Sequence, residues 1–167
     1  GEVRQHHIDL TAELIQAPEL QAELEAKVEE YVAGLEMLAR GVDIVGELTE
    51  RSKDTFCSFG ELLSTTIFAA AMKEQGHDAE WLDVRRVMIT DDNHGFARPL
   101  GDICRENAGA IISPLLDAGT IVITQGYIGA ALNGRTTTLG RGGSDYSAAL
   151  LGAWLNANAI QIWTDVD

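Results

Sequence analysis

One stretch of the sequence has residue types that suit the binding of an anion. Residues 134–145 read Gly-Arg-Thr-Thr-Thr-Leu-Gly-Arg-Gly-Gly-Ser-Asp, with four glycines, two arginines and three consecutive threonines. Glycine lets the backbone turn sharply and approach a ligand closely. Arginine can bind a carboxylate or a phosphate through two parallel hydrogen bonds. We interpret this stretch, the glycine-rich loop, as an anion-binding loop in which Arg135 and Arg141 supply the positive charge.

The glycine-rich loop matches neither of the two common phosphate-binding motifs. A Walker A loop has four residues between its glycines and then a lysine, whereas five residues separate Gly134 from Gly140 and no lysine follows. A dinucleotide fingerprint needs a third glycine where Asp145 stands. The alternative interpretation is a glycine-rich connector whose arginines contact only solvent.

Two further carboxylates are candidates for a site. Glu61 stands three residues after Ser58, which is the spacing of a helix capping box, so it is either a cap or a functional group. Asp165 lies at the end of a predicted strand beside Thr164. Its carboxylate suits Mg²⁺, a nucleotide hydroxyl or the capping of the next turn.

The spacing of apolar residues predicts alternating helices and strands. Two helices are expected between residues 10 and 40, with a break near Pro18 and an end at Gly41. Further helices are predicted at 58–76, 102–116 and 144–156, and strands at 79–84, 86–90, 120–124 and 159–164, the last two buried on both faces. This order favours an α/β fold with a mostly parallel sheet. The glycine-rich loop then follows the 120–124 strand, and ligands of such sheets bind beyond the carboxyl ends of the strands.

The composition indicates one globular domain. The chain has 167 residues, of which 46% are hydrophobic, enough for a core, so wholesale disorder is excluded. A net charge of −14 argues against binding to nucleic acid or anionic membranes, and residues 1–50 carry 12 acidic against 3 basic side chains. Cys57 and Cys104 are expected to be small buried hydrophobes in a reducing, cytoplasmic setting. No apolar run reaches the roughly 18–20 residues that span a bilayer.

Three segments resemble a known enzyme family. The run TTTLGRGGSDYSAALLGAWLNA at 136–157, followed by IQIWTDVD, is similar to the aspartokinases of the amino-acid kinase family, as are VITQGYIGA at 122–130 and SFGELLS at 58–64. The resemblance implies a three-layer α/β/α sandwich of the amino-acid kinase type with a mostly parallel sheet. It also implies ATP-dependent phosphorylation of the side-chain carboxylate of L-aspartate to 4-phospho-L-aspartate, the first step of lysine, threonine and methionine synthesis.

The same resemblance implies roles for individual residues. Arg141 would bind the α-carboxylate of aspartate, and Glu61 would accept hydrogen bonds from its α-ammonium group. The other residues implied are Gly142, Gly143, Ser144 and Tyr127 in the substrate pocket, Asp145 as the catalytic carboxylate that organises the site, and Thr164 and Asp165 at the nucleotide. The implied cofactors are ATP and Mg²⁺, with no protein metal ligand assigned. The implied full-length protein is a cytoplasmic homo-oligomer that binds neither nucleic acid nor membranes.

The chain also departs from the family pattern. The family's first strand ends in a K-F-G-G-[TS] loop, and neither this loop nor the family's later lysine is present in the sequence. We therefore expect a piece of a longer protein, incomplete at both ends of the fold. Residues 1–57 would form an acidic helical region, and 58–167 the aspartate-binding part with some of the nucleotide site. We expect this piece alone to be inactive and to expose an unpaired sheet edge that favours self-association. The alternatives are a non-catalytic amino-acid-binding or assembly module, or a sister kinase acting on another carboxylate.

Overall fold

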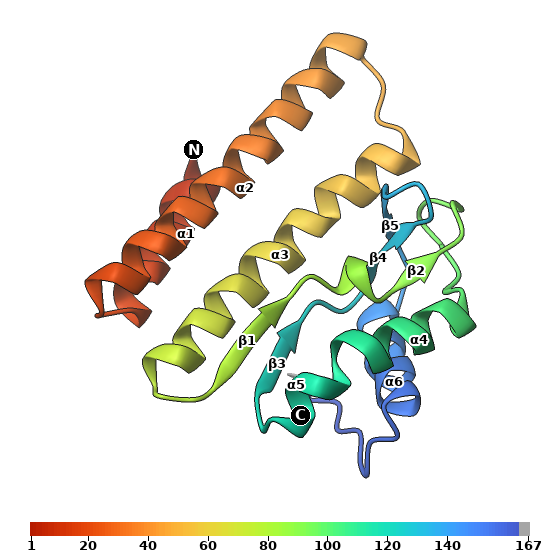
Figure 1. The fold of residues 1–167 in the computed structure, drawn as a ribbon. Coiled ribbons are helices and arrows are strands. Elements are labelled where there is room, and N and C mark those ends of the chain that lie inside the picture. Colours follow the sequence, from red (N-terminus) through yellow and green to blue (C-terminus); the bar gives the residue numbers. More distant parts are fainter. Residues whose placement is uncertain (164–167) are drawn as a thin grey trace.

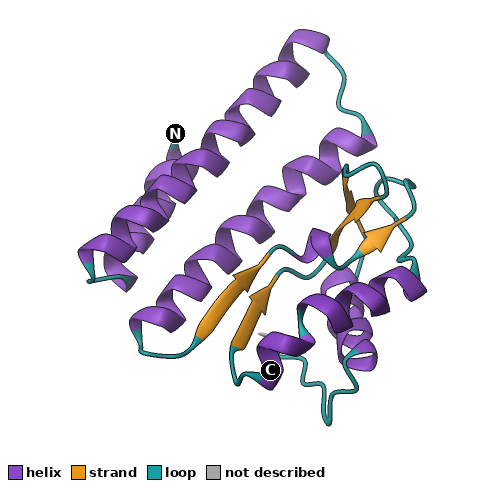
Figure 2. Ribbon diagram, in the orientation of Figure 1, coloured by secondary structure: helices purple, strands orange, loops and turns teal. Residues whose placement is uncertain are grey.

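The computed structural model describes residues 1–163 and has an α/β fold (Figures 1 and 2). Three long helices come first and a mixture of short strands and helices follows. In chain order the elements are α1 (Glu2–Leu14), α2 (Pro18–Val45), α3 (Glu50–Glu74), β1 (Ala79–Leu82), the 3₁₀ turn η1 (Val84–Arg86), β2 (Ile89–Thr90), α4 (Gly101–Ile111), α5 (Ser113–Asp117), β3 (Ile121–Thr124), β4 (Ile128–Ala131), β5 (Thr136–Thr138) and α6 (Gly143–Trp154).

The strands form two small sheets that lie between two groups of helices. Strands β1 and β3 pair in parallel, with Ala79 opposite Ile121. The second sheet has the order β2-β4-β5, in which β2 and β4 are parallel and β4 and β5 antiparallel. Figure 1 shows α1, α2 and α3 on one side of the strands and α4, α5 and α6 on the other. The predicted α/β class with parallel pairing is thus confirmed.

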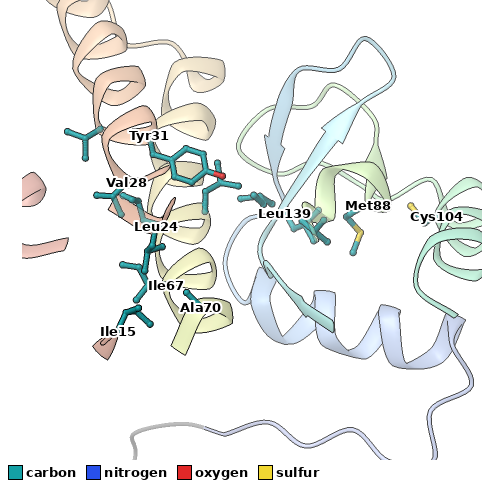
Figure 3. Close-up of a cluster of buried hydrophobic side chains, with 14 residues drawn as sticks. Ile15, Leu24, Val28, Tyr31, Ile67, Ala70, Met88, Cys104 and Leu139 are labelled. Atoms are coloured by element: carbon teal, nitrogen blue, oxygen red, sulfur yellow. The ribbon is translucent and has the colours of Figure 1, made fainter. Parts of the chain in front are cut away.

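One apolar core runs through this arrangement from the long helices to α4. Its buried members among the long helices include Ile15, Leu24, Val28 and Ile67. Beyond them lie Met88 and Leu139, next to β2 and β5, and Cys104 of α4, as Figure 3 shows. Each such aliphatic side chain contributes about 1.5–3 kcal/mol when it is fully buried. The long helices therefore belong to the same folding unit as the strands.

Helix α3 begins eight residues before the predicted start at Ser58. Thr49 caps it, because its Oγ1 accepts a hydrogen bond of 3.1 Å from the Ser52 amide. Ser58 is buried inside the helix, where its Oγ donates to the Thr55 carbonyl at 2.8 Å. The predicted capping box of Ser58 and Glu61 is therefore wrong, and Glu61 lies in the middle of α3 with no capping role.

Helix α3 is also long and apolar enough to cross a membrane by length and composition alone. Its Leu62, Leu63 and Ile67 side chains are, however, buried in the core with α2. The length and apolar composition of α3 are thus also those of a buried core helix.

The ends of α2 agree with the prediction at one terminus only. Pro18 occupies its first turn, as predicted. The predicted end at Gly41 is wrong, because α2 continues to Val45. It stops at Gly46, whose φ of 71° is left-handed and whose amide donates to the Val42 carbonyl at 2.8 Å.

The predicted strands and the later helices also need correction. The expected helix 102–116 is divided at Ile112 into α4 and α5. Residues 159–163, predicted as part of a buried strand, are exposed and form no strand, and Thr164 lies outside the described residues. Strand β3 pairs only with β1 among the described strands, so Ile121 is 42% exposed and β3 is not buried on both faces.

Gly41 and Gly46 form a matched pair for a stability test. A Cβ at either position meets no other atom within 4 Å, but only Gly46 has a positive φ. Gly41→Ala should raise the free energy of unfolding by about 0.5–1 kcal/mol, since alanine favours a helix interior. Gly46→Ala should lower it by about 1 kcal/mol, since an L side chain is strained there. Urea denaturation measures both, and effects of the same sign would contradict the observed end of α2.

Candidate functional site

The segment that links β3 to β4 holds a strained tyrosine. Tyr127 has φ of 66°, a left-handed conformation that is uncommon for a bulky residue and costs on the order of 1–3 kcal/mol. Its amide donates to Ser147 Oγ at 3.0 Å, and its carbonyl accepts from the Leu139 amide at 2.9 Å. These two hydrogen bonds, one to Ser147 of α6 and one with Leu139 in the middle of the glycine-rich loop, hold the tyrosine backbone in place.

Two positions of the glycine-rich loop beside this segment require glycine, one for its backbone conformation and one because no side chain fits. Gly142 is left-handed, with φ of 75°. Gly143 opens α6, and a Cβ on it would lie 2.8 Å from Cδ2 of Tyr127 and 3.2 Å from Cβ of Leu139. Ser147 Oγ in turn donates to the Gly143 carbonyl at 2.7 Å. The loop and the 125–127 segment are therefore interlocked, which the sequence pattern did not reveal.

The predicted anion-binding side chains lie on the open side of this interlock. Arg141, Ser144 and Asp145 are exposed, the last two in the first turn of α6. Among residues 1–163, Arg141 forms no ion pair with a carboxylate. A helix start carries partial positive charge on its free amides. A guanidinium without an ion-pair partner in this range, beside such a helix start, suits an anionic group, and anion binding by Arg141 stays a prediction.

The second arginine of the loop borders a different part of the surface. Arg135 lines a hollow of about 370 Å³ together with Leu38 and Arg51 from the long helices. Arg141 instead borders a groove of about 510 Å³ with Phe96 and Tyr146 among its lining residues. The two arginines of the loop therefore border different hollows.

Glu61 lies on the face of α3 that is directed at the same region. At the two ends of this face, Asp54 Oδ1 accepts from Thr138 Oγ1 at 2.6 Å, and Thr65 Oγ1 accepts from Gln125 Nε2 at 2.8 Å. Glu61 is seven residues after the first and four before the second, so it shares their side of the helix. It is half-buried, and this burial raises the pKa of its carboxyl. No cation within the described residues pairs with it, so it suits an ammonium ligand.

Tyr127 connects the loop side of the site to α3. Burial raises the pKa of its phenol, whose hydroxyl neighbours the side chains of Thr138 and Cys57. Cys57 is one turn before Glu61 and is exposed, so its predicted burial is wrong, whereas Cys104 is buried as predicted and its Sγ donates to the Ile89 carbonyl at 3.1 Å. The aromatic ring thus lies between the Glu61 face of α3 and the start of α6.

Sequence reasoning missed one buried cluster beside the site. The carboxylate of Asp54, only 2% exposed, accepts hydrogen bonds from His94 Nδ1 at 2.7 Å and from the Gly95 amide at 3.1 Å, besides that from Thr138. The only signal in the sequence is the polar run at residues 91–95, which by itself indicates a plain loop.

The predicted nucleotide residues Thr164 and Asp165 lie outside the described residues. Within residues 1–163, no three His, Cys, Asp or Glu side chains gather closely enough to hold a metal ion. Asp145 is the exposed carboxylate in the first turn of α6. A hard cation such as Mg²⁺ is often held by one or two carboxylates plus substrate phosphates, so Asp145 fits a metal that arrives with a nucleotide.

Comparison with known families and proteins agrees with this geometry. The model of the amino acid kinase family matches residues 4–167. The chain is 50% identical over 113 residues to lysine-sensitive aspartokinase 3 of Escherichia coli K12, covering 68% of this chain and 25% of that protein. It is 38% identical over 155 residues to the chloroplastic aspartokinase 3 of Arabidopsis thaliana, covering 85% of this chain and 26% of that protein. The chain therefore spans about a quarter of the length of these relatives.

Two solved structures have the same fold over nearly the whole chain. Escherichia coli aspartokinase III in complex with aspartate and ADP (R-state) matches with a TM-score of 0.81 and 36% identity, covering 96% of this chain and 40% of that one. The same enzyme in complex with lysine and aspartate (T-state) matches with a TM-score of 0.79 and 34% identity, covering 98% and 40%. The resemblance to aspartokinases that the motifs indicated is confirmed.

The tight approach at Gly143 can be tested by adding a methyl group. Gly143→Ala should lower the free energy of unfolding by about 1–3 kcal/mol, because buried Leu139 and the Tyr127 backbone leave no room for the Cβ. Gly109→Ala is the matched control, a helical glycine in α4 with no atom within 4 Å of an added Cβ, and it should stabilise the protein by up to about 1 kcal/mol. Equal effects in urea denaturation would contradict the interlock.

The burial of Glu61 predicts a dependence of stability on pH. Because its pKa is raised in the folded protein, the ionised carboxylate destabilises the fold at neutral pH. Protonation at low pH removes this effect. Glu61→Gln should therefore raise the free energy of unfolding at pH 7, and the difference from wild type should shrink below about pH 4. Glu80→Gln, at an exposed position of β1, controls for the change in net charge. An equal gain in both variants at pH 7 would rule out the effect of burial.

Proposed function

Because the chain belongs to the amino acid kinase family, we propose that the protein containing it is an aspartokinase. The reaction transfers the γ-phosphoryl group of ATP to the side-chain carboxylate of L-aspartate, giving 4-phospho-L-aspartate and ADP. We assign it to the first step of lysine, threonine and methionine synthesis. Two findings support this proposal: the similar proteins are aspartokinases, and one matching solved structure is an aspartokinase in complex with aspartate and ADP.

One observation carries the choice of substrate. Within residues 1–163, the half-buried Glu61 of α3 and the exposed Arg141 of the glycine-rich loop both lack an ion-pair partner. The Tyr127 side chain neighbours Cys57, one turn before Glu61, and Gly143, two residues after Arg141. An amino acid is a zwitterion, so it needs one anionic and one cationic partner. Glu61 would accept hydrogen bonds from the α-ammonium group, and Arg141 would bind the α-carboxylate.

The remaining residues of the pocket hold the substrate in one orientation. Ser144 and the amides of Gly142 and Gly143 would assist Arg141, because the start of α6 favours an anion. Tyr127 would line the pocket, with its backbone held because its amide donates to Ser147 Oγ and its carbonyl accepts from the Leu139 amide. With both α-groups bound in this way, the side-chain carboxylate would be the group left to react with ATP.

The nucleotide side would depend on Asp145 and on residues outside those described. Bound Mg²⁺ would supply charge neutralisation at the phosphates, and Asp145 would be its protein ligand or would orient the groups around it. Thr164 and Asp165 are the proposed contacts of the nucleotide. Catalysis here would consist of positioning and charge stabilisation, since phosphoryl transfer offers the protein little covalent chemistry.

The chain's own lysines are poorly placed to neutralise the transferred group. Lys27 pairs with Glu30 on α2 at 2.8 Å, and Lys53 pairs with Glu50 on α3 at 2.6 Å. Lys73 is near the far end of α3. We propose that a lysine from the rest of the protein supplies this charge and that the 167-residue chain alone does not phosphorylate aspartate. We also propose a cytoplasmic homo-oligomer for the full-length protein.

Substitution of Arg141 tests the proposal in the full-length protein. Arg141→Ala should raise the KM for aspartate roughly ten- to hundredfold, the range for losing hydrogen bonds to a charged group. Arg135→Ala is the matched control in the same loop and should leave the KM nearly unchanged. Formation of aspartyl hydroxamate measures turnover, and calorimetric titration with L-aspartate measures binding.

Each combination of results has a distinct meaning. Binding that Arg141→Ala abolishes, without hydroxamate formation by the wild type, would favour the alternative of a non-catalytic amino-acid-binding module. Turnover with another carboxylic amino acid and none with aspartate would favour a sister kinase. Equal effects of the two arginine substitutions would contradict the assigned role of Arg141.

A further inference from the structure

A buried carboxylate joins three separate parts of the chain beside the proposed pocket. Asp54 lies in the second turn of α3, and its side chain is 2% exposed. One oxygen accepts from Thr138 Oγ1 at 2.6 Å, at the end of β5, and the other accepts from His94 Nδ1 at 2.7 Å. The Gly95 amide donates to both oxygens at 3.1 Å. Thr138, His94 and Gly95 donate to this buried carboxylate and satisfy its hydrogen-bonding capacity. Their hydrogen bonds hold the end of β5 and the 94–95 segment against α3.

The loop held by Asp54 in turn supports the glycine-rich loop. The Ala97 amide donates to the Thr138 carbonyl at 2.8 Å, so the loop of residues 94–97 is hydrogen-bonded to the end of β5. Beside it, the Phe96 ring lies so close to Gly140 that a Cβ there would overlap it. The first glycine after β5 is therefore packed against a loop that Asp54 anchors.

Asp54 and its partner Thr138 are each close in the sequence to one of the two residues proposed to bind aspartate. Glu61 is seven residues after Asp54, which is two turns further along the same face of α3. Arg141 is three residues after Thr138, with Gly140 between them. A shift of Thr138 relative to Asp54 would thus change the separation between the groups proposed to bind the ammonium and the α-carboxylate.

We propose that Asp54 and His94 are positioning residues that set the distance between Glu61 and Arg141, and so the affinity for aspartate. This inference rests on the proposed function, because the two ends of the site are assigned by it. His94 contributes through Nδ1, since an ionised carboxylate can only accept, and its side chain is 16% exposed. Without this donor one oxygen of a buried carboxylate loses its side-chain partner, and the 94–97 loop loses one of its links to α3.

The test uses the full-length protein with three substitutions. His94→Ala removes the donor, whereas His94→Asn retains a side-chain N–H near the position of Nδ1. His77→Ala, at an exposed site after α3, is the matched control. We expect His94→Ala to raise the KM for aspartate roughly tenfold, the size of one lost charge-assisted hydrogen bond. The KM for ATP should change less than about twofold, and His94→Asn should restore most of the loss.

Hydrogen exchange separates this inference from the proposed function, because it needs no substrate. In His94→Ala the amides of residues 139–143 should exchange faster than in wild type, and in His77→Ala they should not. An unchanged KM for aspartate, or equal rises in the KM for aspartate and ATP, in a folded His94→Ala protein would overturn the inference. If the wild type does not phosphorylate aspartate, the proposed function fails. Unchanged exchange at 139–143 would then overturn the positioning role by itself.

Discussion

The close approach of the first turn of α6 to the 125–127 segment is the constraint on which the site depends. Gly143 has no room for a side chain against Tyr127 and Leu139, and a Cβ on Gly126 would lie 3.0 Å from Cα of Ser144. The hydroxyl of Ser147 joins the two segments by donating to one backbone and accepting from the other. Because glycine backbone is packed directly against the neighbouring segment and Ser147 bonds to both, the loop has little freedom to change its distance from the 125–127 segment. The backbone of the loop that carries the proposed anion-binding residues is thereby held in place before any ligand arrives, and such preorganisation lowers the cost of binding.

This local arrangement explains how an acidic protein could bind the proposed ligand through its carboxylate groups. The net charge of −14 repels anions at long range, but interactions between exposed charges are screened beyond about 8–10 Å at physiological ionic strength. Most of the excess acidity is carried by residues 1–50, on the far side of α3 from α6 (Figure 1). Within a few ångströms of the glycine-rich loop, the proposed binding would be decided by a guanidinium without an ion-pair partner in residues 1–163 and by the amides of a helix start. In the proposed function, the surrounding acidity would favour a zwitterion over a simple anion, since the ammonium group offsets the repulsion.

Features that depend on local signals could be predicted from the sequence. Pro18 at the start of α2, the helix after the glycine-rich loop and the α/β class each follow from residues close together in the chain. Features decided by distant partners were missed. Thr49 caps α3 although Ser58 has the better sequence pattern, because the core buries Ser58 inside the helix. The partners of Asp54 are 40 and 84 residues away, so no spacing rule could have found them. The apolar run at 159–163 is typical of a buried strand but has no paired strand within the described residues, and strand formation needs such a neighbour.

The position of α3 explains why the acidic helices and the binding residues act as one unit. On one face its Leu62 and Ile67 side chains are buried with Leu24 and Val28 of α2, and on another Glu61 is directed at the site. A helix of 25 residues is stiff along its axis, so the packing of α1 and α2 sets where that carboxylate lies. An ammonium group bound to Glu61, as proposed, would stabilise the packing of the long helices as well, because a ligand that binds only the folded state adds its binding free energy to stability. The residue whose burial destabilises the empty protein at neutral pH is the one that an ammonium group would compensate. In the proposed function, the energetic penalty of this half-buried carboxylate would be a source of selectivity for a cationic amino group, and the three-helix packing that keeps Glu61 partly buried would maintain it.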